Sequence, residues 1–422
     1  MSASLEHVRD LAAFVTESPT SFHAAAEGAR RLVADGFITV DERAGFVAEP
    51  GSYVLVRDGA LLAWRIPAGV GPGTPYRIVG AHTDSPGFVL KPRPDVGTSG
   101  WQQLGMEIYG GPLLNSWLDR ELGLAGRVVL SSGEQRLVRT GAIMRIPQLA
   151  IHLDRSVNEN GVKLDRQAHT APVWSVGRPD LMIMDQVALL AGCEVDEIDA
   201  VDLSAYATTP PEIFGPNDEF LAAGRLDNLS SVHAGLVAMI NNPHGDAITV
   251  LAAFDHEEIG SESRSGAAGP VLADVLARIS AALGGSLDDH RRALAGSVCL
   301  SADTGHAVHP NYVQRHDPAN RPLLNGGPLL KINANQRYAT DAVGAALWRR
   351  ACRAVGVPTQ EFVSNNAVPC GSTIGPLTAT RLGIRTVDVG IPLLSMHSAR
   401  ELAGVADPLA LSRAMGAFYV QD

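Results

Sequence analysis

Five short segments of the chain contain polar side chains of the types that bind metal ions and move protons. They are His82-Thr-Asp84, Asp227-Asn228, Asp255-His-Glu-Glu258, Asp303-Thr304 and His397-Ser398. Two histidines together with several carboxylates are the usual ligands of hydrolases that use two divalent metal ions. The residue types in these segments therefore predict a two-metal hydrolytic site.

The adjacent acids Glu257 and Glu258 are the most informative pair in this set. Neighbouring carboxylates repel each other, so both stay ionised only when a cation lies nearby. A turn at the end of a strand can direct both side chains to one site. One carboxylate can then bind metal while the other takes a proton from water. The pair therefore predicts a metal ligand beside a general base.

Each of these residues also has an ordinary structural explanation when it is considered alone. His82 could be a hydrogen-bonded structural histidine, Asp227 could cap a helix, and Asp303 could belong to a turn. Glu257 and Glu258 could begin an exposed helix, where the helix dipole favours acids. We prefer the hydrolytic site because the whole set occurs together in one chain.

Short apolar runs precede most of these segments and predict the strands that position them. The runs are Arg77–Ala81, Ile248–Phe254, Ser297–Ser301, Leu329–Asn333 and Thr386–Gly390. Helical patterns lie between them, near 230–241, 269–283 and 340–355. Buried strands that alternate with helices predict an α/β fold with a mixed, largely parallel sheet between two helical layers. Ligands bind at the carboxyl ends of such strands, so we expect the polar segments to converge there.

Two further patterns define the ends of this arrangement. Residues 5–35 have helical spacing, interrupted at 18–21, and residues 53–66 predict a hairpin that turns at Asp58-Gly59. The stretch 86–224 is β-rich and contains a hairpin at 126–139, which predicts an inserted second domain. The first domain, which contains all five polar segments, would then comprise 1–85 plus 225–422.

The overall composition argues against several classes of partner. The 422 residues include 34 basic and 45 acidic side chains, which gives a formal net charge of −11. This balance disfavours nucleic acids and anionic membrane surfaces, because both attract clustered lysine and arginine. No apolar run is long enough to span a membrane, and the first residues do not resemble a signal peptide. Four scattered cysteines without a paired motif indicate reduced thiols and a cytoplasmic location.

Several segments resemble the aspartyl aminopeptidase family of dinuclear zinc aminopeptidases, and the chain is identified as a bacterial member of it. The matching segments are Gly80–Phe88, Ile146–Leu153, Gly224–Leu229, Phe254–Ser261, Ser301–His306, Lys331–Tyr338, Pro369–Pro376 and Met396–Glu401. The resemblance extends from about Pro19 to the C-terminus. It implies the zinc-exopeptidase fold and an aminopeptidase that removes N-terminal residues from peptides. Residues 1–85 plus 225–422 would then be the catalytic metallopeptidase domain, and the insertion 86–224 would act in dimerisation or as a lid.

The resemblance also implies a role for each metal ligand. His82 and Asp303 would hold one zinc ion, and Glu258 and His397 would hold the other. Asp227 would bridge the two ions. Zinc is the default for histidine and carboxylate ligands, although cobalt or manganese would fit the same donors.

Two more residues of the same segments would act in catalysis. Asp84 would fix the orientation of the His82 ring from behind. Glu257 would be the general base that takes a proton from the attacking water and passes it to the leaving amine.

The substrate pocket implied by the resemblance contains Lys331, Tyr338 and backbone groups near Gly371. The family prefers an N-terminal Asp or Glu, which requires a cation, and Lys331 is the candidate. His152 would reach into the active site of a neighbouring subunit, in dimers that assemble into a dodecamer with an internal chamber. Without the resemblance, Lys331 would be interpreted as an exposed strand lysine and His152 as a polar surface residue.

Two other functions are consistent with the same residues. A deacylase or carboxypeptidase could use the same pair of metal ions, although a carboxypeptidase also needs a cation for the substrate α-carboxylate. A non-enzymatic scaffold with a structural metal site is the second alternative. Glu257 argues against the scaffold, because a structural site has no need of a base that does not bind metal.

Overall fold

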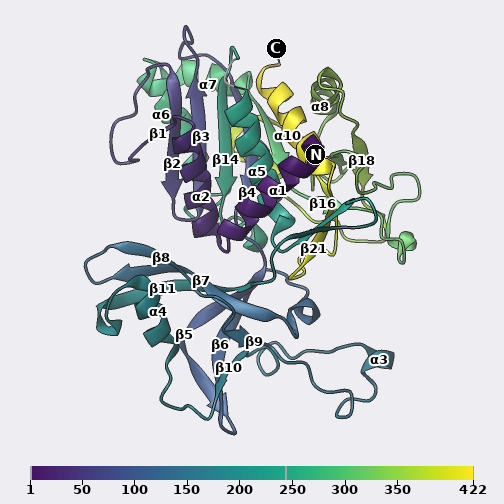
Figure 1. The fold of residues 1–422 in the computed structure, drawn as a ribbon. Coiled ribbons are helices and arrows are strands. Elements are labelled where there is room, and N and C mark those ends of the chain that lie inside the picture. The colour runs from purple at the N-terminus through teal and green to yellow at the C-terminus, as the bar shows by residue number, and fades with distance from the viewer. Residues whose placement is uncertain (1, 243–244, 422) are drawn as a thin grey trace. The chain divides into compact units, whose positions relative to one another are not determined.

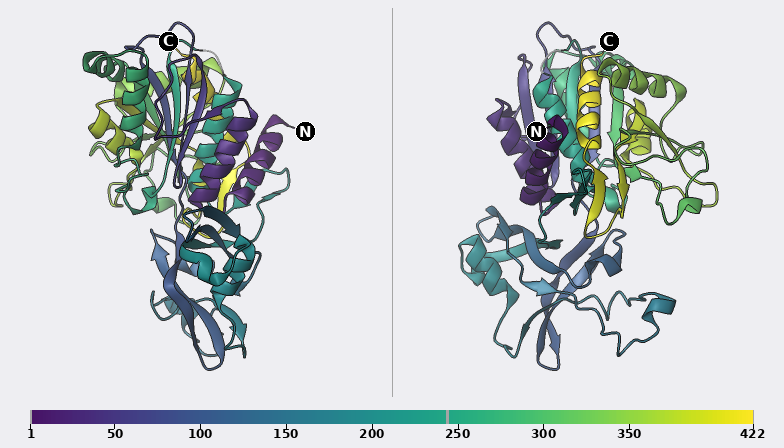
Figure 2. Two further views of the ribbon diagram at one scale, coloured as in Figure 1. Left: turned by 90° about the vertical axis from the view of Figure 1, so that its left-hand side faces the viewer. Right: turned by 45° about the vertical axis from the view of Figure 1, so that its right-hand side comes forward.

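The computed structural model describes residues 2–242 and 245–421, and the chain divides into two compact units (Figures 1 and 2). Unit 1 comprises Met1–Asp84, Glu212–Met396 and Glu401–Asp422, and unit 2 comprises Ser85–Pro211 and His397–Arg400. Unit 1 contains most of the residues that the sequence analysis assigns to chemistry.

A nine-stranded mixed sheet forms the centre of unit 1 (Figure 1). In spatial order its strands are β1 (Ile38–Thr39), β2 (Gly51–Arg57), β3 (Ala60–Ile66), β14 (Ile248–Phe254), β4 (Tyr76–His82), β15 (Val298–Ala302), β19 (Arg385–Gly390), β17 (Leu329–Ile332) and β18 (Gln360–Val363). Strands β14, β4, β15 and β19 run parallel to one another, as do the edge pairs β1–β2 and β17–β18. The remaining pairings are antiparallel. The sheet is thus mixed and largely parallel, as predicted.

Helices cover both faces of this sheet. One face packs against α1 (Ala3–Glu17), α2 (Ser21–Ala34), α5 (Leu226–Asn241), α8 (Ala342–Ala354) and α10 (Asp407–Tyr419). The other face packs against α6 (Val271–Ala282), α7 (Leu287–Ala295) and α9 (Ile374–Leu382). Successive residues of a strand point to opposite faces, so Ile78 of β4 joins the second core and Val79 joins the first. The predicted layer of helices on each face is confirmed.

The central strands are apolar along almost their whole length because they are buried on both faces. Every residue of β14 is buried, and in β4 only Arg77 is partly exposed. The register pairs Phe254 of β14 with His82 of β4, so both strands end at the same level of the sheet. This common level is where the polar segments begin.

The predicted N-terminal elements are also present. Thr20 lies in the predicted interruption at 18–21, and its hydroxyl accepts a hydrogen bond from the amide of His23 at the start of α2. The hairpin of β2 and β3 turns at Asp58, whose φ of 54° is in the left-handed region that such turns use.

Unit 1 contains a second, smaller sheet that the sequence analysis did not predict. In spatial order its strands are β12 (Glu212–Phe214), β13 (Phe220–Ala223), β21 (Glu401–Gly404), β20 (Pro392–Leu394) and β16 (Gly305–His306). Short 3₁₀ turns, η3 (Glu257–Ile259) and η4 (Val313–Arg315), complete the regular structure of unit 1. Because β13 pairs with β21, residues 212–223 lie in unit 1, although the predicted insertion 86–224 included them.

Unit 2 is β-rich, and its sheet closes on itself. In spatial order its strands are β11 (Ile198–Ala207), β5 (Gly87–Thr98), β6 (Trp101–Tyr109), β10 (Val173–Val176), β9 (Met144–Arg145), β7 (Glu121–Leu130) and β8 (Gln135–Arg139). Strand β11 pairs with both β5 and β7, which closes the sheet around a core of its own. The helical pieces are η1 (Leu114–Trp117), α3 (Val157–Asn160), α4 (Ile183–Ala191) and η2 (Val195–Glu197). The predicted hairpin at 126–139 corresponds to β7 and β8.

Hydropathy along the helices gives one further result. Within residues 2–242 and 245–421, no helix combines the length and the apolar character that crossing a membrane requires.

Candidate metal centre

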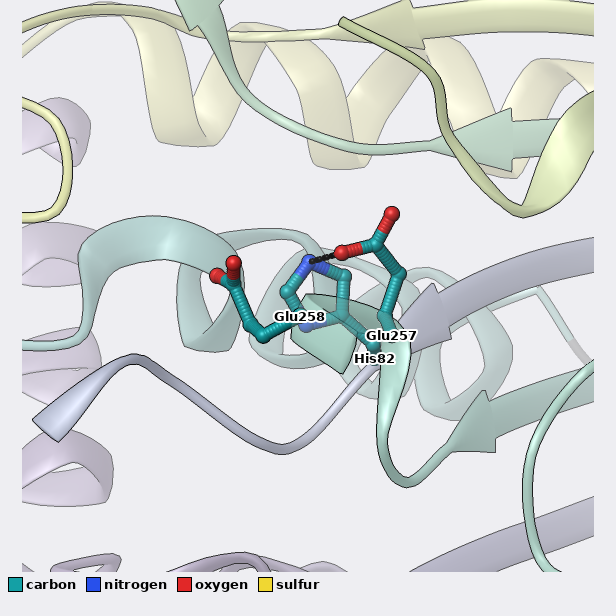
Figure 3. A group of neighbouring side chains, drawn as sticks. All are labelled: His82, Glu257 and Glu258. Carbon is teal, nitrogen blue, oxygen red and sulfur yellow. Dashed lines mark ion pairs between the residues drawn. The ribbon is translucent and has the colours of Figure 1, made fainter. Parts of the chain in front are cut away.

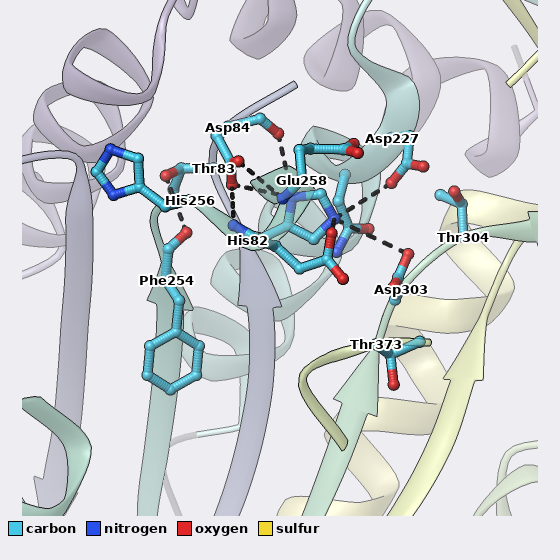
Figure 4. Close-up of polar contacts among 12 residues, drawn as sticks. His82, Thr83, Asp84, Asp227, Phe254, His256, Glu258, Asp303, Thr304 and Thr373 are labelled. Carbon is cyan, nitrogen blue, oxygen red and sulfur yellow. Dashed lines mark hydrogen bonds and ion pairs between the residues drawn. The ribbon is translucent and has the colours of Figure 1, made fainter. Parts of the chain in front are cut away.

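His82 is the last residue of β4, and its ring is only 1% exposed. Its Nδ1 atom lies 3.1 Å from the carbonyl oxygen of Asp84 and 3.3 Å from Asp84 Oδ1, so Nδ1 carries the proton and donates. Nε2 is then the ring atom that is left to bind a metal ion. Figure 4 shows the ring directed at a group of carboxylates.

Carboxylates from three other segments surround Nε2 of His82. Asp227 Oδ1 lies 3.3 Å from it, and Glu257 Oε2 and Asp303 Oδ1 each lie 3.9 Å from it (Figures 3 and 4). These acids come from the start of α5, the loop after β14 and the loop after β15. The structure thus brings together residues that are more than 200 positions apart in the sequence.

Asp84 contacts both His82 and the Glu257-Glu258 turn. Its two carboxylate oxygens accept hydrogen bonds from the backbone amides of Glu257, at 3.0 Å, and Glu258, at 3.1 Å. The same carboxylate faces Nδ1 of His82. Asp84 therefore contacts the ring that the resemblance expects it to orient, and it also holds the turn that directs the two glutamates. The second contact was missed because no sequence signal reports that β4 and β14 are parallel neighbours.

Glu257 and Glu258 begin the 3₁₀ turn η3, which follows β14 after Asp255 and His256, and their side chains point toward His82 (Figure 3). Burial, together with the charges of Asp303 and Asp227, raises the pKa of Glu257 to about 8. Burial and the charge of Asp227 likewise raise the pKa of Glu258 well above its ordinary value. The exposed helix start considered as an alternative is wrong for this pair. His256, between the strand and the pair, instead contacts Ser263 Oγ at 2.9 Å and points away.

Asp227 and Asp303 are held by backbone hydrogen bonds. The amide of Asp227 donates to Oε2 of the buried Glu401 at 2.9 Å, and the amide of Asp303 donates to the carbonyl of Val389 at 2.9 Å. The N-cap position of α5 is Arg225, which makes no side-chain cap hydrogen bond, and Asp227 has non-helical backbone dihedrals within the first turn. Glu401 was also missed, because a lone acid four residues after His397 carries no recognisable pattern.

The donors of this group fit divalent metal ions. One nitrogen of His82 and one oxygen each of Asp227 and Asp303 lie within 4.8 Å of one another, and so do donor atoms of His82, Glu257 and Glu258. Burial opposes protonation of His82, but the surrounding carboxylates outweigh burial and raise the pKa of its ring well above 6.5. The site therefore attracts positive charge, and imidazole with carboxylates is the donor set that zinc accepts.

Lys331 and Tyr338 lie beside these carboxylates. The Nζ atom of Lys331 donates to the carbonyl of Thr304 at 2.5 Å and lies 3.9 Å from Asp303 Oδ1. It also lies 5.4 Å from the ring centre of Tyr338. The alternative of an exposed strand lysine is wrong, because Lys331 is 2% exposed. Burial raises the pKa of the Tyr338 hydroxyl, so this group stays protonated.

The other predicted site residues have less enclosed positions. Gly371 is exposed, and its carbonyl accepts a hydrogen bond from Arg337 Nε at 3.3 Å. His152 is exposed in unit 2. His397 belongs to the short segment of unit 2 that follows Met396, and its Nδ1 lies 3.1 Å from the carbonyl of Gly111. Its part in the metal centre stays a prediction.

Comparison with known proteins identifies the family. A model of the aminopeptidase I zinc metalloprotease family, M18, matches residues 14–419. The chain belongs to this family. It is therefore a metallo-aminopeptidase of the M18 family, and the resemblance to the aspartyl aminopeptidases is confirmed.

Individual M18 proteins are similar over nearly the whole chain. The probable M18 family aminopeptidase 2 of Streptomyces avermitilis is 53% identical over 420 residues, which cover 98% of this chain and 97% of that protein. Among solved structures, a chain in the cryo-EM structure of the Ape4 and Nbr1 complex is 33% identical, with a TM-score of 0.95 over 99% of this chain and 86% of that one. A chain of the S. cerevisiae mApe1 dodecamer is 28% identical, with a TM-score of 0.86, covering 98% of this chain and 96% of that one.

Proposed function

We propose that this M18 member releases N-terminal residues, preferably Asp or Glu, from peptides by means of two divalent metal ions, both zinc. The proposed ligands are His82, Asp227, Glu258, Asp303 and His397. The observation that carries the proposal is the convergence of one imidazole nitrogen and several buried carboxylates at the carboxyl ends of β4, β14 and β15. Several buried carboxylates repel one another, so they require cations nearby in order to stay ionised.

Roles for the chain's own groups follow from their positions. When bound, the two ions act as Lewis acids that polarise the scissile carbonyl and make water a stronger nucleophile. Asp84 holds the proton on Nδ1 of His82, so that Nε2 remains a ligand. Glu257 takes the proton from the attacking water at its carboxylate and returns it to the leaving amine. Burial makes this carboxylate a stronger base than an exposed glutamate.

Lys331 is our candidate for recognition of an acidic N-terminal side chain. Its ammonium group is enclosed beside Asp303 and the ring of Tyr338, so a cation is present within the proposed pocket. The walls would be Tyr338 and the backbone near Gly371. A buried cation attracts a substrate carboxylate more strongly than an exposed one does, because water screens it less.

We propose further that the protein is a homo-oligomer, with dimers assembled into a dodecamer, in which His152 completes the site of a neighbouring subunit. Three large apolar side chains near His152, Leu149, Ile151 and Leu153, are 60%, 45% and 74% exposed. Such a cluster on one segment favours burial against another chain. The dodecameric mApe1 structure supports the same assembly. Analytical ultracentrifugation tests it, and a monomer at micromolar concentration would contradict it.

Unit 2 is our candidate for the dimerisation or lid element, and the cytoplasm is the proposed location. All four cysteines are free thiols, which is consistent with a reducing compartment.

The direct test is a panel of aminoacyl-chromophore substrates assayed with and without a chelator, followed by addition of defined metal ions. We expect N-terminal Asp and Glu substrates to be cleaved fastest, chelation to abolish cleavage and zinc to restore it. An N-acetylated copy of the best substrate is the matched control, and we expect it to resist cleavage. Equal turnover of the blocked substrate would contradict an aminopeptidase and favour a deacylase or carboxypeptidase.

A further inference from the structure

Asp388 of β19 is a fully buried carboxylate that lies outside the metal centre. Its Oδ1 accepts a hydrogen bond from Thr373 Oγ1 at 2.5 Å, and its Oδ2 accepts one from the amide of Ala339 at 2.6 Å. Its own amide donates to Thr340 Oγ1 at 2.9 Å. One residue thus connects two loops, 333–341 and 369–373, that are separate in the sequence.

These two loops carry the proposed walls of the substrate pocket. Tyr338 directly precedes Ala339, and Gly371 lies two positions before Thr373. The loops also contact each other, because Arg337 Nε donates to the carbonyl of Gly371 at 3.3 Å and Ser372 Oγ donates to the carbonyl of Arg337 at 3.2 Å. Those two contacts are at the exposed surface, whereas the contacts of Asp388 are buried.

The third proposed pocket residue, Lys331, is also adjacent to Asp388. Leu330 of β17 pairs with Val389 of the antiparallel β19, so Lys331 and Asp388 are the next residues along the two strands. The charge of Lys331 favours the ionised form of Asp388, although burial alone raises the pKa of that carboxyl. Asp388 therefore contacts the loops that carry Tyr338 and Gly371 and is next to Lys331 in the sheet.

Helix α9 leaves room for the carboxylate of Asp388. A Cβ atom added to Gly375 of α9 would lie 2.5 Å from both oxygens of Asp388, so the glycine leaves the space that the carboxylate fills. A buried carboxylate contributes little net stability compared with an apolar residue of similar size. Packing alone therefore does not account for an acid at this position.

We propose that Asp388 is a positioning residue for substrate binding, which holds the loops of Tyr338 and Gly371 at a fixed separation next to Lys331. The proposal rests on the function proposed above. Asp388 acts on how well the N-terminal side chain of the substrate is bound, and it leaves the metal ligands and Glu257 unchanged.

The test compares Asp388→Asn with the wild-type protein. An asparagine has no charge and only one acceptor oxygen, so the bond from the Ala339 amide weakens, and a bond to Thr373 forms only if its hydroxyl accepts instead of donating. We expect KM for the best aminoacyl substrate to rise about tenfold, which corresponds to the loss of one buried hydrogen bond, while kcat changes by less than about threefold. Metal content should stay at the wild-type value. Hydrogen exchange of the Ala339 amide, measured without substrate, should become faster.

Two further variants keep the proposal testable if Asp388→Asn does not fold. Thr373→Val removes one donor and should raise KM in the same way, and Thr373→Ser should restore the wild-type KM. Asp289→Asn is the matched control, because Asp289 accepts from the Ser286 amide at the start of α7 and pairs with Arg292 at the surface, outside both loops. It should leave KM unchanged.

Two outcomes overturn the role of Asp388. Faster exchange of Ala339 with an unchanged KM would show that the tie is only structural, and loss of metal together with kcat would place Asp388 in support of the metal centre. If the wild-type protein cleaves no aminoacyl substrate, the proposed function fails instead. The exchange measurement then still reports whether Asp388 holds the Ala339 loop.

Discussion

In the proposed mechanism Asp84 holds the site in place and Glu257 takes part in the reaction. Asp84 accepts hydrogen bonds from two backbone amides and faces Nδ1 of His82, so its carboxylate serves to orient these groups. Glu257 lies 3.9 Å from Nε2 of His82 and retains a carboxylate that can take up a proton. Both residues are acids, and the different contacts of their carboxylates account for the different roles that we propose for them.

The substitution Glu257→Gln tests the role of this carboxylate. The amide cannot accept a proton from water, so we expect kcat to fall by about 10²–10⁴-fold while the metal content is unchanged. The measurement is steady-state kinetics together with metal analysis of the same sample. Glu262→Gln, an exposed glutamate of the following loop, is the matched control and should behave as wild type. Wild-type activity of Glu257→Gln would remove Glu257 as the base.

For single residues, the sequence predicts which side chains belong to the site better than it predicts their contacts. The acids and His82 were expected to converge because most of their segments follow an apolar run, and the structure brings His82, Asp227, Glu257 and Asp303 together. The burial of Lys331 could not be predicted from the residues alone, since a lysine on a strand is usually exposed. It depends on the packing of Thr304 and Tyr338 around the ammonium group.

Among the elements, the parallel strands β14, β4 and β15 determine where the site forms. Their carboxyl ends lie side by side, because the register pairs Phe254 with His82 and Ser301 with Gly80. Long apolar runs made these strands predictable. Strands β12, β16 and β20 were missed because two or three residues carry no periodicity, and β16 pairs with β20, which is distant in the sequence.

Helices α1, α2 and α5 enclose a second group of ionisable residues with a different consequence. His233 Nε2 lies 2.7 Å from Asp10 Oδ2, and the ring of His7 packs 4.8 Å from that of His233. Burial and the nearby His233 lower the pKa of His7 to about 3. Between pH 6.5 and 3 the unfolded chain therefore binds a proton at His7 that the folded chain does not bind.

This difference predicts that stability falls as the pH drops below 6.5. One such group contributes a slope of about 1.4 kcal/mol per pH unit. Urea unfolding at pH 7, 6 and 5 measures the effect, and His7→Leu should reduce the pH dependence by about that slope. His169→Leu, at an exposed position of unit 2, is the control. Equal pH dependence in wild type and His7→Leu would contradict a buried, neutral His7.

For the whole molecule, the charges of the site contrast with those of the surface. The chain carries a formal net charge of −11, yet unit 1 gathers buried carboxylates around a single histidine nitrogen. Several exposed acids pair with arginine, as in Arg292 with Asp288. The acids of the site have fewer cationic side chains than carboxylates around them, so bound metal ions are the simplest way to keep these carboxylates ionised. The β-rich character of unit 2 was predictable, whereas its use could not be deduced from composition.

The most direct measurement is the number of divalent ions bound per folded chain, determined by inductively coupled plasma mass spectrometry after dialysis. We predict two ions per chain in the wild type and a loss of at least one in His82→Ala. His306→Ala, outside the site, should keep both. An active wild-type protein without bound divalent ions, or a His82→Ala variant that retains two, would contradict the two-metal centre.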